Sequence, residues 1–122
     1  MKFIKFLVAA MIAVFAVGSL AGCATESRAV TEFAAVIDVR TTDEWNSGHL
    51  ESALLIPIAS SNFDAQLEEL DKAADYYIYC RSGNRAGQAI DRMIDAGFTG
   101  ELVNGGSVAN ASKILNIAVV ND

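Results

Sequence analysis

Short apolar blocks and longer polar stretches alternate along most of the chain. Four apolar blocks, rich in β-branched or aromatic residues and bounded by turn residues, predict buried strands at residues 34–39, 53–58, 76–80 and 101–104. Stretches with helical spacing lie between and after them. Strands that alternate with helices need crossover connections, so the pattern predicts a single α/β domain with a parallel sheet of about four strands flanked by helices.

Three stretches have apolar residues at helical spacing. Residues 63–70 have them at i, i+4 and i+7, behind polar residues that can cap a helix. Residues 86–94 form the clearest amphipathic pattern, and Gly97 is positioned to end that helix. A weaker pattern over residues 108–118 follows two glycines and predicts a last helix.

The first 22 residues have the layout of a secretory signal peptide. Lys2 and Lys5 precede an uncharged apolar run over residues 6–17, and small residues follow it. The run stops short of the roughly 20 residues that a helix needs to cross a bilayer. A signal peptide is therefore favoured over an uncleaved membrane anchor.

The motif LAGC, Leu20 to Cys23, resembles the lipobox of bacterial lipoproteins. The resemblance implies that Cys23 is lipidated and becomes the mature N-terminus, anchored in the cell envelope. Because Ala24 and not aspartate follows, the family's sorting rule favours the outer membrane facing the periplasm. A soluble periplasmic protein is the alternative. Residues 23–33 are then expected to form a tether, and residues 34–122 the domain.

The chain beyond the signal segment is strongly acidic. It keeps all fifteen acidic residues but only seven of the nine basic ones, a side-chain net charge of −8. Such a surface argues against nucleic acid as a partner and against polybasic binding to anionic lipid. One histidine and one available cysteine are too few for a His/Cys metal site, so no metal cofactor is expected.

Cys80 is the candidate nucleophile. If Cys23 carries lipid, Cys80 has no partner within the chain, and an odd thiol in an exported protein indicates an intermolecular disulfide or a reactive site. A buried inert cysteine is the alternative. Cys80 ends a predicted strand and precedes a helix, which places it at the carboxyl edge of the sheet, where α/β proteins bind ligands.

The loop after Cys80 has the composition of an anion-binding nest. Five residues separate Cys80 from the predicted helix: Arg81, Ser82, Gly83, Asn84 and Arg85. Gly83 and Asn84 tolerate left-handed backbone angles, so the loop can turn its N–H groups inward, towards the positive end of the following helix. These groups would lower the pKa of the thiol, and the two arginines would attract an anion unless they are merely solvated.

Three motifs together resemble the rhodanese-type sulfurtransferases, and most closely their short envelope members. They are VIDVRTTDEWNSGHLESALLIPI, YCRSGNRAGQA and NGGS, and they cover residues 36–106. The resemblance implies a rhodanese-like fold and no cofactor. It implies that Cys80 takes the outer sulfur of thiosulfate as a persulfide, releases sulfite, and passes the sulfur to a thiophilic acceptor such as cyanide or a thiol. The backbone of residues 81–85 would cradle the sulfur, while Arg81 and Arg85 would hold the donor.

The resemblance also assigns supporting roles around the site. Asp38 and Arg40 occupy the DVR positions and are expected to organise the structure. His49 matches the GH motif and is expected to be structural. Glu44 and Trp45 match a carboxylate-plus-aromatic position and are expected to cap and pack.

Other functions remain open on the sequence. A cysteine phosphatase or arsenate reductase places five residues between its cysteine and arginine, whereas Cys80 and Arg85 enclose four. This shorter loop favours a single sulfur atom over a tetrahedral oxyanion. A non-catalytic interaction module is disfavoured because inactive copies generally lose the cysteine. A persulfide carrier needs the same thiolate and stays an alternative to the enzyme.

Overall fold

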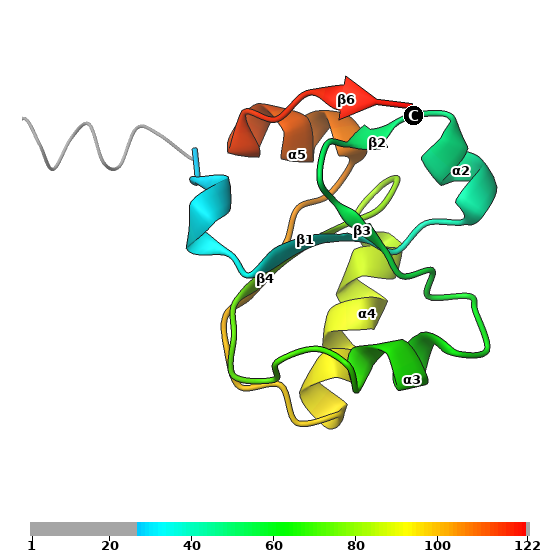
Figure 1. Ribbon diagram of the computed structural model, residues 1–122, viewed down its shortest axis with the longest axis vertical. Coiled ribbons are helices and arrows are strands. Elements are labelled where there is room, and N and C mark those ends of the chain that lie inside the picture. Colours follow the sequence, from blue (N-terminus) through cyan, green and yellow to red (C-terminus); the bar gives the residue numbers. More distant parts are fainter. Residues whose placement is uncertain (1–26, 122) are drawn as a thin grey trace, which may run out of the picture.

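A four-stranded, all-parallel sheet forms the centre of the protein (Figure 1). The computed structural model describes residues 27–121. The strands are ordered β3-β1-β4-β5 across the sheet, and each pairs in parallel with its neighbours. Their bounds are β1 Ala35–Asp38, β3 Leu54–Leu55, β4 Tyr76–Tyr79 and β5 Leu102–Asn104. The predicted α/β fold with a parallel sheet of about four strands is therefore confirmed.

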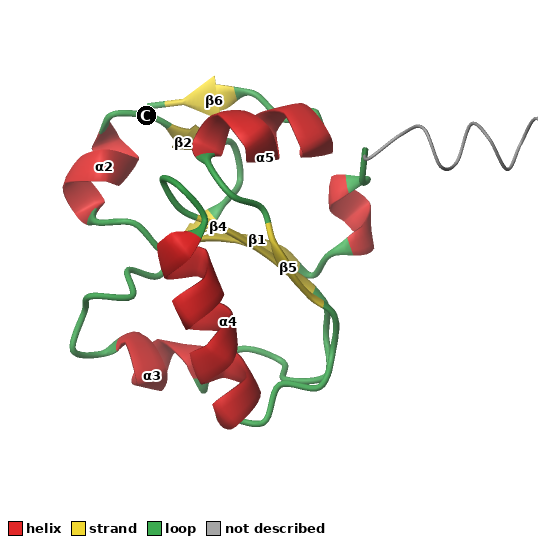
Figure 2. Ribbon diagram, turned by 180° about the vertical axis from the view of Figure 1, so that it is seen from behind, coloured by secondary structure: helices red, strands yellow, loops and turns green. Residues whose placement is uncertain are grey.

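Helices cover both faces of this sheet. On one face lie α3 (Phe63–Leu67) and α4 (Asn84–Asp95), and on the other lies α5 (Val108–Leu115) (Figures 1 and 2). A short helix, α2 (Thr42–Asn46), follows β1. The covering of both faces explains why the strands read as continuous apolar runs without a polar alternation.

The central strand β4 divides its side chains between the two layers. Ile78 and, just past the strand, Cys80 pack in the core beneath α3 and α4. Tyr77 and Tyr79 point the opposite way, into the core beneath α5. All of these side chains are buried, so the strand reaches the site with its direction fixed from both sides.

Two helices differ in extent from the sequence pattern. The first, α3, ends at Leu67 and does not extend to residue 70. The second, α4, begins at Asn84, two residues before the apolar pattern starts, and Gly97 follows it with the expected positive φ of 99°. Ile94, expected on the buried face of α4, is 57% exposed, because Met93 and Ala89 already fill that face.

The sequence pattern missed a second, antiparallel pair of strands. β2 (His49–Leu50) pairs with β6 (Val119–Val120). Two-residue strands carry no detectable periodicity, so apolar spacing could not reveal them. The last predicted helix accordingly ends at Leu115 and not at residue 118, and the chain continues as this strand.

The described part of the predicted tether, residues 27–33, lies against the domain. It contains a 3₁₀ turn, η1 (Val30–Glu32). Arg28 forms an ion pair with Glu101 at 2.9 Å, and Phe33 packs edge-on against Tyr77. Cys23 and the predicted signal peptide lie outside the described residues. Among residues 27–121, no helix has the length and apolar character needed to cross a membrane.

Candidate functional site

The candidate site lies where the connections of the sheet change direction. β1 and β4 are neighbours, but the chain leaves β1 towards β3 on one side and leaves β4 towards β5 on the other. In open α/β sheets, ligands bind beyond the carboxyl ends of the strands at such a switch point. Cys80 follows β4 directly, and Arg40 lies just beyond β1.

The Cys80 thiol lies at the floor of its loop, within reach of several backbone N–H groups. The Gly83 N–H donates to Sγ at 2.9 Å and the Ala86 N–H at 3.4 Å. Burial alone would raise the pKa of the Cys80 thiol, but hydrogen bonds from the N–H groups of Ala86, Ser82, Gly83 and Arg85 hold that pKa below its ordinary value. The site therefore stabilises a thiolate.

The loop owes its shape to one left-handed residue. Gly83 has φ = 96°, which a residue with a side chain rarely adopts, and it precedes the first turn of α4. Asn84, expected in the loop before the helix, is instead the first helical residue. The N-terminus of this twelve-residue helix therefore begins inside the predicted loop, and its free N–H groups face the sulfur.

Asn104, at the end of β5, ties the loop to the rest of the site. Its side-chain amide donates to the Gly83 carbonyl at 2.9 Å, and its side-chain oxygen accepts from the Gly106 N–H at 3.0 Å. The Gly106 carbonyl in turn accepts from the Cys80 N–H at 2.9 Å. Sequence reasoning did not single out Asn104, although the NGGS motif that contains it was the available signal.

The two loop arginines have different surroundings. Arg85 forms a two-pronged ion pair with Glu44, with Nη1 to Oε1 at 2.7 Å and Nη2 to Oε2 at 2.9 Å. Its backbone N–H still faces the sulfur. Arg81 is exposed, and within residues 27–121 its side chain has no hydrogen-bond or ion-pair partner.

Asp38 and Arg40 form a buried ion pair beside the site. Arg40 Nη2 lies 2.7 Å from Asp38 Oδ2, and Nε lies 3.0 Å from Oδ1. Arg40 Nη2 also donates to the Gly48 carbonyl at 2.6 Å. The Asp38 side chain is fully buried, so removing one partner would leave an uncompensated charge. The pair joins the end of β1 to the turn before β2.

Trp45 and His49 stack beside this pair. Their ring centroids lie 3.5 Å apart with an interplanar angle of 6°, and His49 Nδ1 lies 2.9 Å from the Trp45 carbonyl. His49 is buried and forms part of β2. Both side chains thus serve the packing of α2 on β2.

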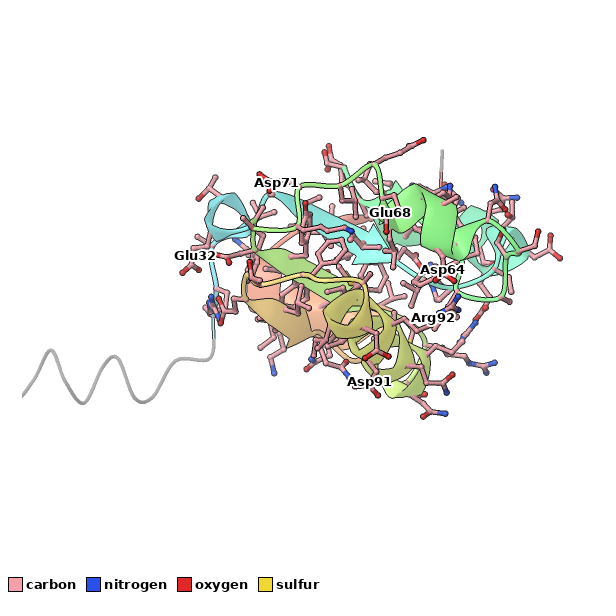
Figure 3. The ribbon with its side chains drawn as sticks, turned by 90° about the horizontal axis from the view of Figure 1, so that it is seen from below. Glu32, Asp64, Glu68, Asp71, Asp91 and Arg92 are labelled. Atoms are coloured by element: carbon pink, nitrogen blue, oxygen red, sulfur yellow. The ribbon has the colours of Figure 1, made fainter. Side chains whose placement is uncertain are left out.

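A second charged group lies between α3 and α4. Arg92 forms an ion pair with Asp64 at 2.7 Å, and both line a surface hollow of about 340 Å³ together with Glu68. Figure 3 labels these three side chains, which lie near one another in that view. Within residues 27–121, no histidine, cysteine and carboxylate side chains are grouped so that they could hold a metal ion.

Known proteins of similar sequence share the name of the predicted activity. A "Sulfurtransferase" from Allochromatium vinosum is 35% identical over 89 residues, which cover 71% of this chain and 80% of that protein. "Thiosulfate sulfurtransferase PspE" from Escherichia coli is 28% identical, and the match covers 68% of this chain and 73% of that protein. "Probable adenylyltransferase/sulfurtransferase MoeZ" from Mycobacterium tuberculosis is 35% identical over 66% of this chain, but the chain spans only 21% of that protein.

Solved structures and a family model extend the similarity to the fold. Protein hp1203 from Helicobacter pylori is 30% identical with a TM-score of 0.63, covering 80% of this chain and 86% of that one. The "rhodanese with anions from E. coli" superposes with a TM-score of 0.57, covering 72% of this chain and 98% of that one. Its sequence identity of 24% supports similarity of fold alone. Residues 24–112 match the family model described as "Rhodanese-like domain". The chain therefore belongs to the rhodanese-like family.

Proposed function

We propose that the protein is a sulfurtransferase that moves sulfane sulfur from thiosulfate, or a related anionic donor, to a thiophilic acceptor through a persulfide on Cys80. The observation that carries this proposal is the set of backbone N–H groups around the Cys80 sulfur. They favour the charged form of that thiol despite its burial. The thiolate is the nucleophilic form of cysteine, so the site supports nucleophilic attack by the Cys80 sulfur.

The proposed reaction has two balanced steps. The Cys80 thiolate attacks the outer sulfur of thiosulfate, a new S–S bond forms, and sulfite leaves with the electron pair of the broken bond. An acceptor nucleophile, such as cyanide or a thiolate, then attacks the outer sulfur of the persulfide. Thiocyanate or a new persulfide leaves, and the Cys80 thiolate is restored. Neither step requires an external oxidant or reductant.

The loop residues would stabilise the transferred sulfur. N–H groups that converge on the Cys80 sulfur can also hydrogen-bond a terminal persulfide anion as its charge forms. These groups belong to Ser82, Gly83, Arg85 and Ala86, and the side chains of Arg81 and Arg85 add positive charge. Asp38 and Arg40 would support the site through their buried ion pair and not by contact with substrate.

The length of the loop favours sulfur transfer over phosphate chemistry. Only four residues separate Cys80 from Arg85, and the Arg85 side chain is already bound to Glu44. A phosphatase of this general type needs a wider loop whose arginine is free to bind the oxyanion. An aryl phosphate should therefore not be hydrolysed.

Replacing the nucleophile tests the proposal. Mature protein incubated with thiosulfate should gain the mass of one sulfur atom, and cyanide should then yield thiocyanate. Cys80→Ser should lose both the adduct and the thiocyanate, since its hydroxyl is not appreciably ionised at neutral pH. Intact-mass spectrometry and colorimetric thiocyanate detection provide the readouts. Unchanged turnover in Cys80→Ser would defeat the assignment.

We also propose that the protein acts in the bacterial cell envelope. The sequence of residues 1–23 supports export and lipidation at Cys23, with the outer membrane favoured by Ala24. The domain would then face the periplasm on a short tether. A soluble periplasmic form is expected if Cys23 carries no lipid.

A further inference from the structure

The Glu44–Arg85 ion pair links two segments that lie far apart in the sequence. Glu44 belongs to α2, after β1, whereas Arg85 belongs to the first turn of α4, after β4. Both guanidinium–carboxylate bonds are short, and each side chain is roughly one-third exposed or less. Two parallel bonds of this kind fix direction as well as distance.

Glu44 is held independently of Arg85. Its carboxylate accepts bonds from the Thr41 N–H at 3.2 Å and the Thr41 hydroxyl at 3.1 Å, while the Thr41 hydroxyl accepts from the Glu44 N–H. This capping box places the carboxylate at the start of α2. The Arg85 bond, together with the weaker Thr41 bonds, lowers the pKa of Glu44 to about 2 against the opposing effect of burial, so the carboxylate is charged at neutral pH. Arg85 therefore faces a fixed anion before any donor arrives.

Arg81 is the other cation of the loop, and it has no such partner among the described residues. It follows Cys80 directly, and its side chain is exposed. An arginine without an ion-pair partner can form charge-assisted hydrogen bonds with an incoming anion.

We propose that Glu44 is a positioning residue that engages the Arg85 guanidinium in place of the donor, so that Arg81 supplies the cation that binds the donor anion. This inference rests on the proposed sulfur transfer. The Glu44–Arg85 pair holds the first turn of α4 against α2, and that turn carries N–H groups that contact Sγ. The pair therefore affects the rate of attack, whereas Arg81 affects how tightly the anion binds.

Single-turnover kinetics separate the two roles. Persulfide formation is followed by mass spectrometry over a range of thiosulfate concentrations. Arg81→Ala should raise the half-saturating concentration about tenfold, the loss expected for one charge-assisted bond, and change the maximal rate by less than about twofold. Glu44→Gln and Arg85→Gln should lower the maximal rate by similar factors, about 3- to 30-fold, and leave half-saturation nearly unchanged.

The double variant and a matched arginine provide controls. Because the two residues act as one unit, Glu44→Gln/Arg85→Gln should be no slower than either single variant. Arg92→Gln breaks an ion pair of α4 away from the site and should change neither parameter. The inference is overturned if Arg85→Gln raises half-saturation as much as Arg81→Ala does, or if Arg81→Ala leaves it unchanged. If Glu44→Gln does not fold, the Arg85→Gln variant by itself tests the role of the ion pair.

A pair of alkylating reagents tests Arg81 without sulfur transfer. Arg81→Ala should slow the reaction of Cys80 with anionic iodoacetate several-fold but leave the reaction with neutral iodoacetamide unchanged. Equal slowing with both reagents would show that Arg81 acts on the thiol and not on the anion. Wild-type protein that forms no persulfide would refute the proposed function, while the ratio of the two alkylation rates would still decide the role of Arg81.

Discussion

The Cys80 thiol is activated by backbone groups more than by charged side chains. Burial works against the thiolate, and four N–H groups of the following turn reverse that effect. Because these donors belong to the main chain, no single side-chain substitution in the loop removes them. His49 belongs to β2 and stacks on Trp45.

The lowered pKa of Cys80 predicts a specific pH dependence of alkylation. In mature protein carrying Cys23→Ala, Cys80 is the sole cysteine. Its reaction with iodoacetamide should follow a titration with a midpoint below about 8.5, the value of a free thiol, and urea-unfolded protein should titrate near that value. A folded midpoint at or above the unfolded one would contradict the thiolate site.

The lowered pKa of Cys80 also determines how this thiol changes the stability of the fold with pH. Because the folded pKa of Cys80 lies below the unfolded one, the thiolate stabilises the fold fully above the unfolded pKa. This contribution is lost as the pH falls through the folded pKa. The corresponding part of the pH dependence of unfolding should be missing from Cys80→Ser.

At the residue scale, the sequence predicted which residues form the site better than it predicted the contacts that those residues make. Cys80 and its loop could be found because a thiol, a glycine and two arginines are adjacent along the chain. The contact between Arg85 and Glu44 spans 41 residues and depends on how α2 packs, which local patterns do not encode. The hydrogen bond from Asn104 to Gly83 depends in the same way on the tertiary fold.

At the scale of elements, the strands and helices agree with the apolar pattern in kind and order but not in length. Each predicted strand contains an observed one, because a buried parallel strand needs a continuous apolar run. The ends differ because hydrogen bonding, and not hydrophobicity, decides where an element stops. β2 and β6 were missed because two residues are too few to form a pattern.

Glycines in and near α4 give a stability test at this scale. Gly87 lies within α4, and a Cβ there would meet Asn104 at 3.5 Å, an ordinary contact. Gly87→Ala should therefore stabilise the protein by about 0.5–1 kcal/mol through the lower entropy of its unfolded chain. Urea unfolding monitored by circular dichroism would measure the change.

Gly100 provides the matched opposite case. A Cβ at this position would collide with the Ala74 carbonyl oxygen, and the backbone there cannot turn aside as a side chain could. Gly100→Ala should thus destabilise the fold by about 1–3 kcal/mol. Equal responses of the two alanine variants would contradict the close approach of Gly100 to the Ala74 backbone.

At the scale of the whole molecule, the acidic surface and the site have opposite character. Acidic side chains such as Asp64, Glu68 and Asp91 are spread over the helical layer of α3 and α4 (Figure 3). The loop after Cys80 contains two arginines and no acidic residue. The loop therefore presents positive charge at the position where an anionic donor would bind.

The proposed anchor can be tested on the whole molecule. Protein isolated from bacterial membranes should carry acyl chains at Cys23, and growth with a clickable fatty acid should label it. Cys23→Ala should lose the label, whereas Cys80→Ser should keep it. Membrane-bound protein with an unmodified Cys23 would rule out the lipoprotein and favour a transmembrane anchor.

The antiparallel pairing of β2 and β6 connects the last described residues to the buried charges at the site. β2 begins directly after Gly48, whose carbonyl accepts a bond from Arg40, and β6 holds β2 in place. A reporter or affinity tag fused closely behind Val120 would strain this strand pair and, through Gly48, the buried Asp38–Arg40 ion pair. A C-terminal tag is therefore best joined to the protein through a long spacer, so that the measured turnover reflects the native site and not the effect of the tag.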